Sequence, residues 1–309
     1  METEIDVVIP TCKPGEEFLG LLEVLAKQTL TPGRIIIMNT EEKYFERLKY
    51  GRANLDAYQN VEVHHLSTRE FDHGNTRNKG IKKSHAPYFV CMTQDAVPAD
   101  EFLLEKLLEP LLAGKAQVSY ARQLPKRDCR PAERFTKEFN YPEQSRIKGE
   151  EDLAELGIKT FFCSNACAAY ERATFDKLGG FIHRTIFNED MIYASKVIRN
   201  GGKIAYAAQA KVLHSHNYTW RQNFRRNFDL GVSQADHPEV FGGIRSESEG
   251  IKLVRQTADY LKKNGDTKEI IPMLWCSGWK YLGYQLGRHY QKLPKKMVVS
   301  CSMNRNYWQ

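Results

Sequence analysis

The stretch IDVVIPTCKPGEEFLGLLEVLAKQTLTPGRIIIMNT, residues 5–40, contains the pattern that decides the fold. Ile5–Ile9 is rich in β-branched residues and predicts a buried strand, which ends at Pro10 and Thr11. The apolar residues in 16–28 recur at the spacing of an amphipathic helix, and Arg34–Met38 predicts a second buried strand. A strand, a helix and another strand in such close succession predict a βαβ unit with parallel strands.

The same alternation continues to about residue 120. Val61–Leu66 and Pro87–Met92 are two more segments of strand type, with a helical pattern between them. Ligands of parallel α/β sheets bind beyond the carboxyl ends of the strands. The polar residues that follow each strand are therefore the first candidates for a binding site.

Beyond Tyr120 the pattern changes. Residues 121–160 are polar and contain prolines, residues 161–216 mix strand and helix patterns, and the chain from Trp220 onward is mainly helical. We expect an α/β fold with a Rossmann-like, mostly parallel sheet flanked by helices. We also expect a division into residues 1–218, which carry the site, and a helical C-terminal region, residues 219–309.

Composition excludes several classes of protein. The net charge of +7 suits phosphate-bearing ligands or an anionic membrane surface, but no nucleic-acid-binding module accompanies it, so nucleic acid is not an expected partner. Seven scattered cysteines do not form a disulfide framework. The acidic N-terminus has no leader pattern, and no apolar run is long enough for a spanning helix. These features predict a cytoplasmic protein.

The common catalytic motifs are missing. The sequence has no GxxxxGK[ST], GxGxxG, HExxH or GxSxG pattern. A protein of the common ATPase, dehydrogenase, zinc protease or serine hydrolase class is therefore not expected. Cys163 and Cys167 lack a second cysteine pair, so a zinc site is not expected.

Thr93-Gln94-Asp95 follows the fourth strand and lies in the expected ligand crevice. A carboxylate there can bind Mg²⁺ or Mn²⁺ together with diphosphate oxygens. The alternative is that Asp95 caps the next helix, and the spacing alone does not separate the two readings.

Two further clusters precede helical patterns. Residues 71–78, FDHGNTRN, can bind an anion at a helix N-terminus, with Arg77 as an additional donor, or can simply begin a helix. Glu189 and Asp190 follow a Gly179-Gly180 turn, and one of them can act as a general base, although acids are also favoured at a helix start.

His214 and His216 end a predicted strand, where the two-residue period places them on one face. Two histidines on one strand face are more often ligands than core residues. Together with Asp95 they form a candidate metal site.

In this order, the motifs resemble the inverting glycosyltransferases of family 2, which have the GT-A fold. FDHGxTRN, TQDAxP, Ser164-Asn165-Ala166, Asn188-Glu189-Asp190 and HSH, taken together, resemble the rhamnosyltransferase branch. The resemblance covers residues 4–235. It implies transfer of L-rhamnose from dTDP-L-rhamnose to a hydroxyl of a saccharide, lipid-linked or free, in cell-wall or capsular polysaccharide synthesis.

The resemblance also implies a role for each matching residue. Asp190 would be the general base, and Asn165 and Glu189 would contact the acceptor. Asp95, His214 and His216 would bind the divalent metal, Mn²⁺ or Mg²⁺. The donor would lie against Pro10, Thr11, Asn39, Asp72, Gly74, Arg77, Thr93, Gln94 and Asp95.

Two alternatives to this reaction stay open. The first acid of the family's DxD metal motif is Thr93 here, which leaves a non-catalytic nucleotide-sugar-binding protein as one alternative. A transferase for galactofuranose, glucose or N-acetylglucosamine is another.

An apolar stripe with adjacent basic residues marks the C-terminal region. Trp275, Trp279, Leu282 and Leu286 recur at helical spacing, and five Lys and Arg residues lie beside or after them. Such a helix suits the anionic inner face of a membrane, where a lipid-linked acceptor would be found. It equally suits packing on its own domain or on a second subunit of a homo-oligomer.

Overall fold

The computed structural model describes residues 4–50, 58–242 and 247–309, and its internal contacts divide the chain into two compact units. We call residues 1–124, 142–184 and 189–214 the sheet unit. Residues 125–141, 185–188 and 215–309 form the helical unit. The first three residues of the acidic N-terminus lie outside the described residues.

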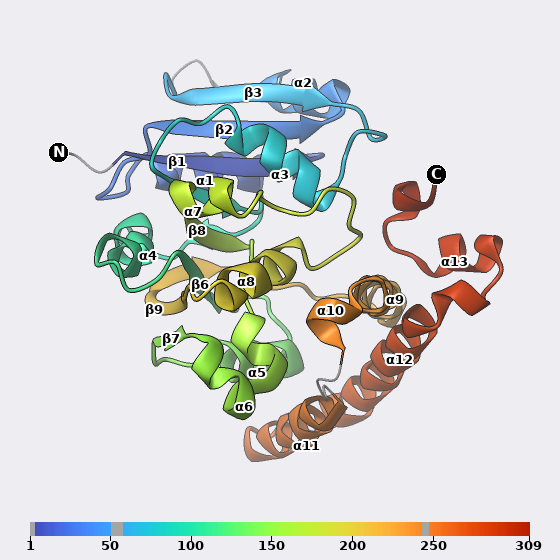
Figure 1. Cartoon of the computed structure of the whole chain (residues 1–309). Coiled ribbons are helices and arrows are strands. Elements are labelled where there is room, and N and C mark those ends of the chain that lie inside the picture. Colours follow the sequence, from blue (N-terminus) through green and yellow to red (C-terminus); the bar gives the residue numbers. More distant parts are fainter. Residues whose placement is uncertain (1–3, 51–57, 243–246) are drawn as a thin grey trace. The chain divides into compact units, whose positions relative to one another are not determined.

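The described part of the sheet unit contains one nine-stranded sheet of order β3-β2-β1-β4-β8-β6-β9-β5, with β7 paired to β9 (Figure 1). Its strands are β1 (Ile5–Cys12), β2 (Arg34–Thr40), β3 (Val61–Leu66), β4 (Tyr88–Met92), β5 (Val97–Pro98), β6 (Val118–Leu124), β7 (Arg146–Lys148), β8 (Cys167–Glu171) and β9 (Ile204–Leu213).

The predicted strands form one half of this sheet. β3, β2, β1 and β4 are mutually parallel, which confirms the alternation of strands and helices in the N-terminal sequence. The other half is mixed, because β8 runs antiparallel to both β4 and β6, while β6 and β9 are parallel. The fold is therefore α/β as expected, with a parallel half joined to a mixed half.

Alternation along β1 directs its side chains to two layers of helices. Ile5, Val7 and Ile9 join the core formed with α1 (Glu16–Leu25) and α4 (Leu103–Leu112). Val8 points the other way, toward Gly80 in α3 (His73–Ile81). The remaining α-helices of this unit are α2 (Glu42–Tyr50), α6 (Leu153–Leu156), α7 (Arg172–Lys177) and α8 (Glu189–Arg199).

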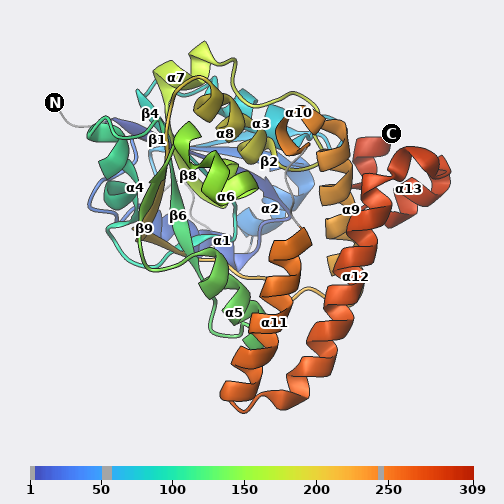
Figure 2. The ribbon, with the colours of Figure 1, turned by 60° about the horizontal axis from the view of Figure 1, so that its bottom comes forward.

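The described residues of the helical unit form helices and no strands. Its α-helices are α5 (Pro131–Asn140), α9 (Trp220–Asp236), α10 (Pro238–Phe241), α11 (Glu247–Lys263), α12 (Ile270–Arg288) and α13 (Lys295–Cys301). α9 and α12 lie side by side along their length (Figure 2). Across the described ranges, no helix combines the length and the apolar character needed to cross a membrane.

The contact between α9 and α12 combines aromatic side chains with glycines. Trp220 and Phe224 pack on Trp279, with ring centroids 4.7 and 5.8 Å apart, so this aromatic stripe of α9 is packing within the unit. Gly283 and Gly287 face α9 so closely that a Cβ atom on either would lie within 2.2 Å of a carbonyl oxygen of that helix.

We expect Gly287→Ala to destabilise the protein by ~1–3 kcal/mol or more, since its Cβ atom would lie 2.1 Å from the Phe228 carbonyl oxygen and force the helices apart. Gly278→Ala is the matched control, because a Cβ atom there meets nothing within 4 Å. Alanine at that exposed helical position should stabilise by about 0.5–1 kcal/mol. Thermal unfolding of both variants checks this, and equal midpoints would contradict the packing argument.

Candidate active site

Most of the site residues predicted from the sequence lie at one edge of the sheet. β4, β6 and β9 share one direction and β8 runs against them, so the carboxyl ends of the first three meet the amino end of β8. Asp95 follows β4, His214 follows β9, and Asn165 precedes β8. The Thr93 amide donates to the Ala166 carbonyl oxygen over 3.2 Å, which joins two of these segments directly.

Asn165 holds both acids of the predicted pair. Its backbone amide donates to Asp190 Oδ2 over 2.9 Å, and its side-chain amide donates to Glu189 Oε1 over 3.1 Å. Its own Oδ1 accepts a hydrogen bond of 2.7 Å from the Tyr170 hydroxyl, which fixes the orientation of the amide. Asn165 is 2% exposed, so this geometry favours positioning of the acid pair over direct contact with an acceptor.

The two acids differ in their electrostatic surroundings. Burial alone would raise the pKa of Glu189. The Arg77 guanidinium, 3.1 Å away, acts together with His73 and the hydrogen bonds from Asn165 and the backbone, and their combined effect lowers the pKa. Burial and the negative charge of Glu189 raise the pKa of Asp190 to about 7. Asp190 nevertheless retains partial solvent exposure. It is therefore the acid that can be reached by a substrate and exchange a proton near neutral pH.

Arg77 lies behind this pair. Its guanidinium donates to the His73 carbonyl oxygen over 2.9 Å and contacts Glu189, and the residue is 4% exposed. Its placement favours a role in keeping Glu189 ionised over direct contact with a diphosphate.

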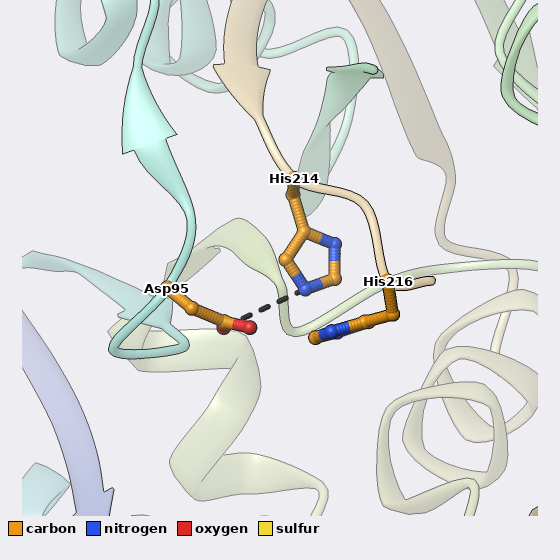
Figure 3. A group of neighbouring side chains, drawn as sticks. All are labelled: Asp95, His214 and His216. Atoms are coloured by element: carbon orange, nitrogen blue, oxygen red, sulfur yellow. Dashed lines mark ion pairs between the residues drawn. The ribbon is translucent and has the colours of Figure 1, made fainter. Parts of the chain in front are cut away.

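Asp95 does not cap a helix. It lies in the turn between β4 and the two-residue strand β5, and α4 begins only at Leu103, so the capping alternative is wrong. Its Oδ1 lies 3.5 Å from Nε2 of His214 (Figure 3).

His214 is oriented by two residues behind it. Its Nδ1 lies 2.9 Å from Gln123 Oε1, and Gln123 Nε2 donates to Ser164 Oγ over 2.9 Å. With the amide held this way, Nδ1 of His214 is the donor, and Nε2 can present a lone pair toward Asp95. An imidazole fixed through its second nitrogen is the usual arrangement of a metal-ligating histidine.

His216 follows His214 by two residues, and the three side chains form a group that could hold a metal ion (Figure 3). Each offers one ligand atom, and these atoms lie within 4.8 Å of one another. The ring of His216 stacks on Tyr218, with centroids 4.8 Å apart. A carboxylate with two imidazoles suits Mn²⁺ better than Mg²⁺, which prefers oxygen ligands.

The predicted nucleotide-binding residues lie at the ends of β1 and β2. Pro10 and Thr11 pair in register with Met38 and Asn39, and Thr11 Oγ1 donates to Asn39 Oδ1 over 3.1 Å. Gln94 forms two hydrogen bonds with the backbone of Cys12, of 2.8 and 3.1 Å, and so ties the end of β1 to the turn that carries Asp95.

The start of α3 has a clear structural role. Asp72 Oδ1 accepts from the amides of Gly74 and Asn75, so it caps this helix. A Cβ atom on Gly74 would lie 2.1 Å from the Ile182 carbonyl oxygen, so the glycine is needed for packing against this neighbouring segment. Donor contact by these two residues stays a prediction.

Sequence reasoning missed several supporting residues. Gln123 and Tyr170 lie within strands, and only the structure shows that they orient His214 and Asn165. Lys148 is a buried lysine whose Nζ donates to the carbonyl oxygens of Lys159 and Phe162, and so anchors the segment that leads to Asn165. None of these three residues belongs to a motif that could have identified it in the sequence.

The whole chain is similar in sequence to known glycosyltransferases. The profile of Glycosyl transferase family 2 matches residues 6–179. The O-antigen chain rhamnosyltransferase RfbN of Salmonella typhimurium is 36% identical, over 99% of this chain and 96% of its own length. The O-antigen chain rhamnosyltransferase WbaN of Salmonella anatum is 37% identical, over 98% and 95%.

Solved structures share the fold at low sequence identity. The mannosyltransferase PcManGT from Pyrobaculum calidifontis, in complex with GDP-Man and Mn²⁺, has a TM-score of 0.58 at 11% identity, covering 99% of this chain and 87% of that one. S. aureus TarS (residues 1–349) in complex with UDP has a TM-score of 0.53 at 12% identity, covering 94% and 91%. The matching profile and the two long alignments confirm the resemblance seen in the motifs, and this chain belongs to glycosyltransferase family 2.

Proposed function

We propose that this glycosyltransferase moves L-rhamnose from dTDP-L-rhamnose to a hydroxyl of a lipid-linked saccharide, in polysaccharide synthesis at the cytoplasmic face of the membrane. The choice of sugar is supported by the two relatives, which are named as O-antigen rhamnosyltransferases and align over nearly the whole chain.

The observation that carries the proposal is the setting of Asp190. The Asn165 amide fixes one of its oxygens, burial and the ionised Glu189 raise its pKa to about 7, and part of its surface stays open. Such a carboxylate can take the proton of an acceptor hydroxyl while that oxygen attacks the anomeric carbon. The bond from the anomeric carbon to the diphosphate breaks in the same step, dTDP leaves, and the configuration inverts.

Asp95, His214 and His216 would hold a divalent metal, for which Mn²⁺ fits the donor atoms best. When bound, the metal would supply positive charge to the leaving diphosphate, whose negative charge grows as the glycosidic bond breaks. The donor side of the site would then extend along the ends of β1 and β2, past Thr11 and Asn39.

We expect Gln123→Met to weaken Mn²⁺ binding by ~10–100-fold, the usual effect of removing an outer-shell partner of a metal-ligating histidine. The change removes the acceptor of the His214 Nδ1–H bond while keeping the volume of the side chain. Gln123→Glu retains an acceptor and should bind Mn²⁺ nearly as the parent does. Titration of Mn²⁺ followed by electron paramagnetic resonance measures both constants, and equal binding by the Met variant would remove Gln123 from this role.

A cavity inside the helical unit supports an acceptor that combines sugar and lipid. Its volume is about 820 Å³, and its wall includes His216 and the amide side chains of Asn223 and Asn227. Leu230 and Met273 contribute apolar surface to the same wall. We propose that a saccharide and the start of its lipid carrier bind here.

A donor panel tests the whole proposal. Purified protein with Mn²⁺ would be offered nucleotide sugars, including dTDP-L-rhamnose, and a saccharide acceptor on a short water-soluble carrier, with release of nucleoside diphosphate as the readout. Release from dTDP-L-rhamnose alone, lost on chelation, is the expected result. Release from another donor would overturn the choice of sugar. Silence with every donor in the presence of a competent acceptor would favour a nucleotide-sugar-binding protein.

A further inference from the structure

One face of α12 exposes large apolar side chains. Ile271 is 78% exposed, Leu274 48%, Trp275 58% and Leu282 44%. These positions recur at i, i+3, i+4 and i+11, so they form one stripe along about three turns of the helix. Gly278 lies on the same stripe, and a Cβ atom there would meet nothing within 4 Å.

This stripe is distinct from the face that stabilises the helical unit. Met273, Gly283 and Gly287 lie on the opposite side of α12 and are buried, and the two glycines pack directly on α9. α12 therefore has two apolar faces, of which one packs within its unit and the other is exposed. Exposed apolar surface of this extent marks an interaction site.

The charge of the surrounding segment indicates the partner. Residues 270–309 contain six Lys and Arg residues and no Asp or Glu, so they carry +6 of the chain's net charge of +7. The cations are Lys280, Arg288, Lys292, Lys295, Lys296 and Arg305. Two copies of such a segment would repel each other, whereas a surface of anionic lipid headgroups would attract it.

We infer that the exposed stripe of α12 and the cationic residues after it dock on an anionic phospholipid surface. Trp275 and the aliphatic side chains would enter the boundary between headgroups and acyl chains, and α12 would lie in the plane of the interface. The neighbouring lysines would meet the headgroup phosphates. This inference deepens the proposed function and rests on it for one point, that a lipid-linked acceptor is held in the same membrane.

Flotation of the purified full chain with vesicles tests the surface. The parent protein should float with vesicles of phosphatidylglycerol and phosphatidylcholine, should not float with pure phosphatidylcholine, and should be largely released at about 0.5 M salt, where charges are screened. Trp275→Ser combined with Leu282→Ser should lower the bound fraction at least ~10-fold through the loss of buried apolar area. Phe102→Ser, at a 43% exposed position of the sheet unit, is the matched control and should bind as the parent does.

The charges are tested separately. Lys295→Gln combined with Lys296→Gln should weaken vesicle binding by about five-fold per charge. Lys115→Gln combined with Lys177→Gln, two exposed lysines of the sheet unit, should leave it unchanged. A parent protein that fails to bind the anionic vesicles would overturn the inference. So would an apolar double variant that changes from dimer to monomer with vesicle binding intact, since the stripe would then be a contact between copies.

Failure of this inference is separable from failure of the proposed function. Diphosphate release with the water-soluble acceptor needs no membrane and should be the same in the parent and in all four variants. Loss of that activity in the parent would overturn the proposed reaction and leave the flotation result standing.

Discussion

Replacing Asp190 by asparagine should lower turnover by ~10²–10⁴-fold and leave the fold intact, because a positioned general base typically contributes that factor. Asparagine keeps the shape of the side chain and can still accept one of the two backbone hydrogen bonds, from Asn165 or from Met191. A carboxylate whose pKa is raised from 3.8 to about 7 destabilises the folded state when it ionises, so its loss should not lower the melting temperature at neutral pH.

The pH dependence supplies a second readout of the same variant. In the parent, kcat/KM should fall as the pH drops below about 7, because protonated Asp190 cannot accept the acceptor's proton. Asp190→Asn should lose this acidic limb along with the activity. Asp176→Asn, at an exposed position of α7, serves as the control and should keep both rate and profile. Turnover of the Asp190 variant within a few-fold of the parent would remove Asp190 as the base.

The parallel half of the fold could be predicted because β1, β2 and β4 are compact apolar segments, and β3 belongs to the same alternation of strands and helices. Ile5–Ile9 and Ile35–Met38 are buried on both faces and lie in the strands that the structure shows. β8 (Cys167–Glu171) could not be predicted in the same way, because it has only five residues and its antiparallel pairing with β4 joins residues 75 to 83 positions apart in the sequence. Short strands are defined by their partners more than by their own sequence.

The candidate site shows the same limit. The sequence predicted five site residues, because acids and histidines next to the ends of predicted strands or helices can be identified from the pattern. These residues are Asp95, Glu189, Asp190, His214 and His216. The sequence could not reveal that Glu189 pairs with Arg77, which lies 112 residues earlier and is itself buried. That pairing is one of the contacts that lower the pKa of Glu189, whereas burial and the neighbouring Glu189 raise the pKa of Asp190. Burial and a guanidinium distant in the sequence are set by the folded structure, so the sequence could not show which of the two acids is poised near neutral pH.

Replacing Asp95 by asparagine should weaken Mn²⁺ binding and lower diphosphate release by ~100-fold or more. Outer-shell partners of metal ligands already cost ~10–100-fold when removed, and Asp95 would be a direct ligand. It is also the single carboxylate of the Thr93-Gln94-Asp95 segment, so no neighbouring acid in the segment can replace its charge. Asparagine preserves the size of the side chain and removes the negative charge that a divalent ion requires.

The same measurement ranks the two histidines. His214→Ala should cost more Mn²⁺ affinity than His216→Ala, because Gln123 fixes the ring of His214 with its Nε2 toward Asp95. The ring of His216 stacks on Tyr218, with centroids 4.8 Å apart. Electron paramagnetic resonance titration reports Mn²⁺ affinity independently of turnover. An Asp95→Asn variant that bound Mn²⁺ as tightly as the parent would exclude this carboxylate from the metal site, and the positive charge for the departing diphosphate would then have to come from elsewhere in the protein.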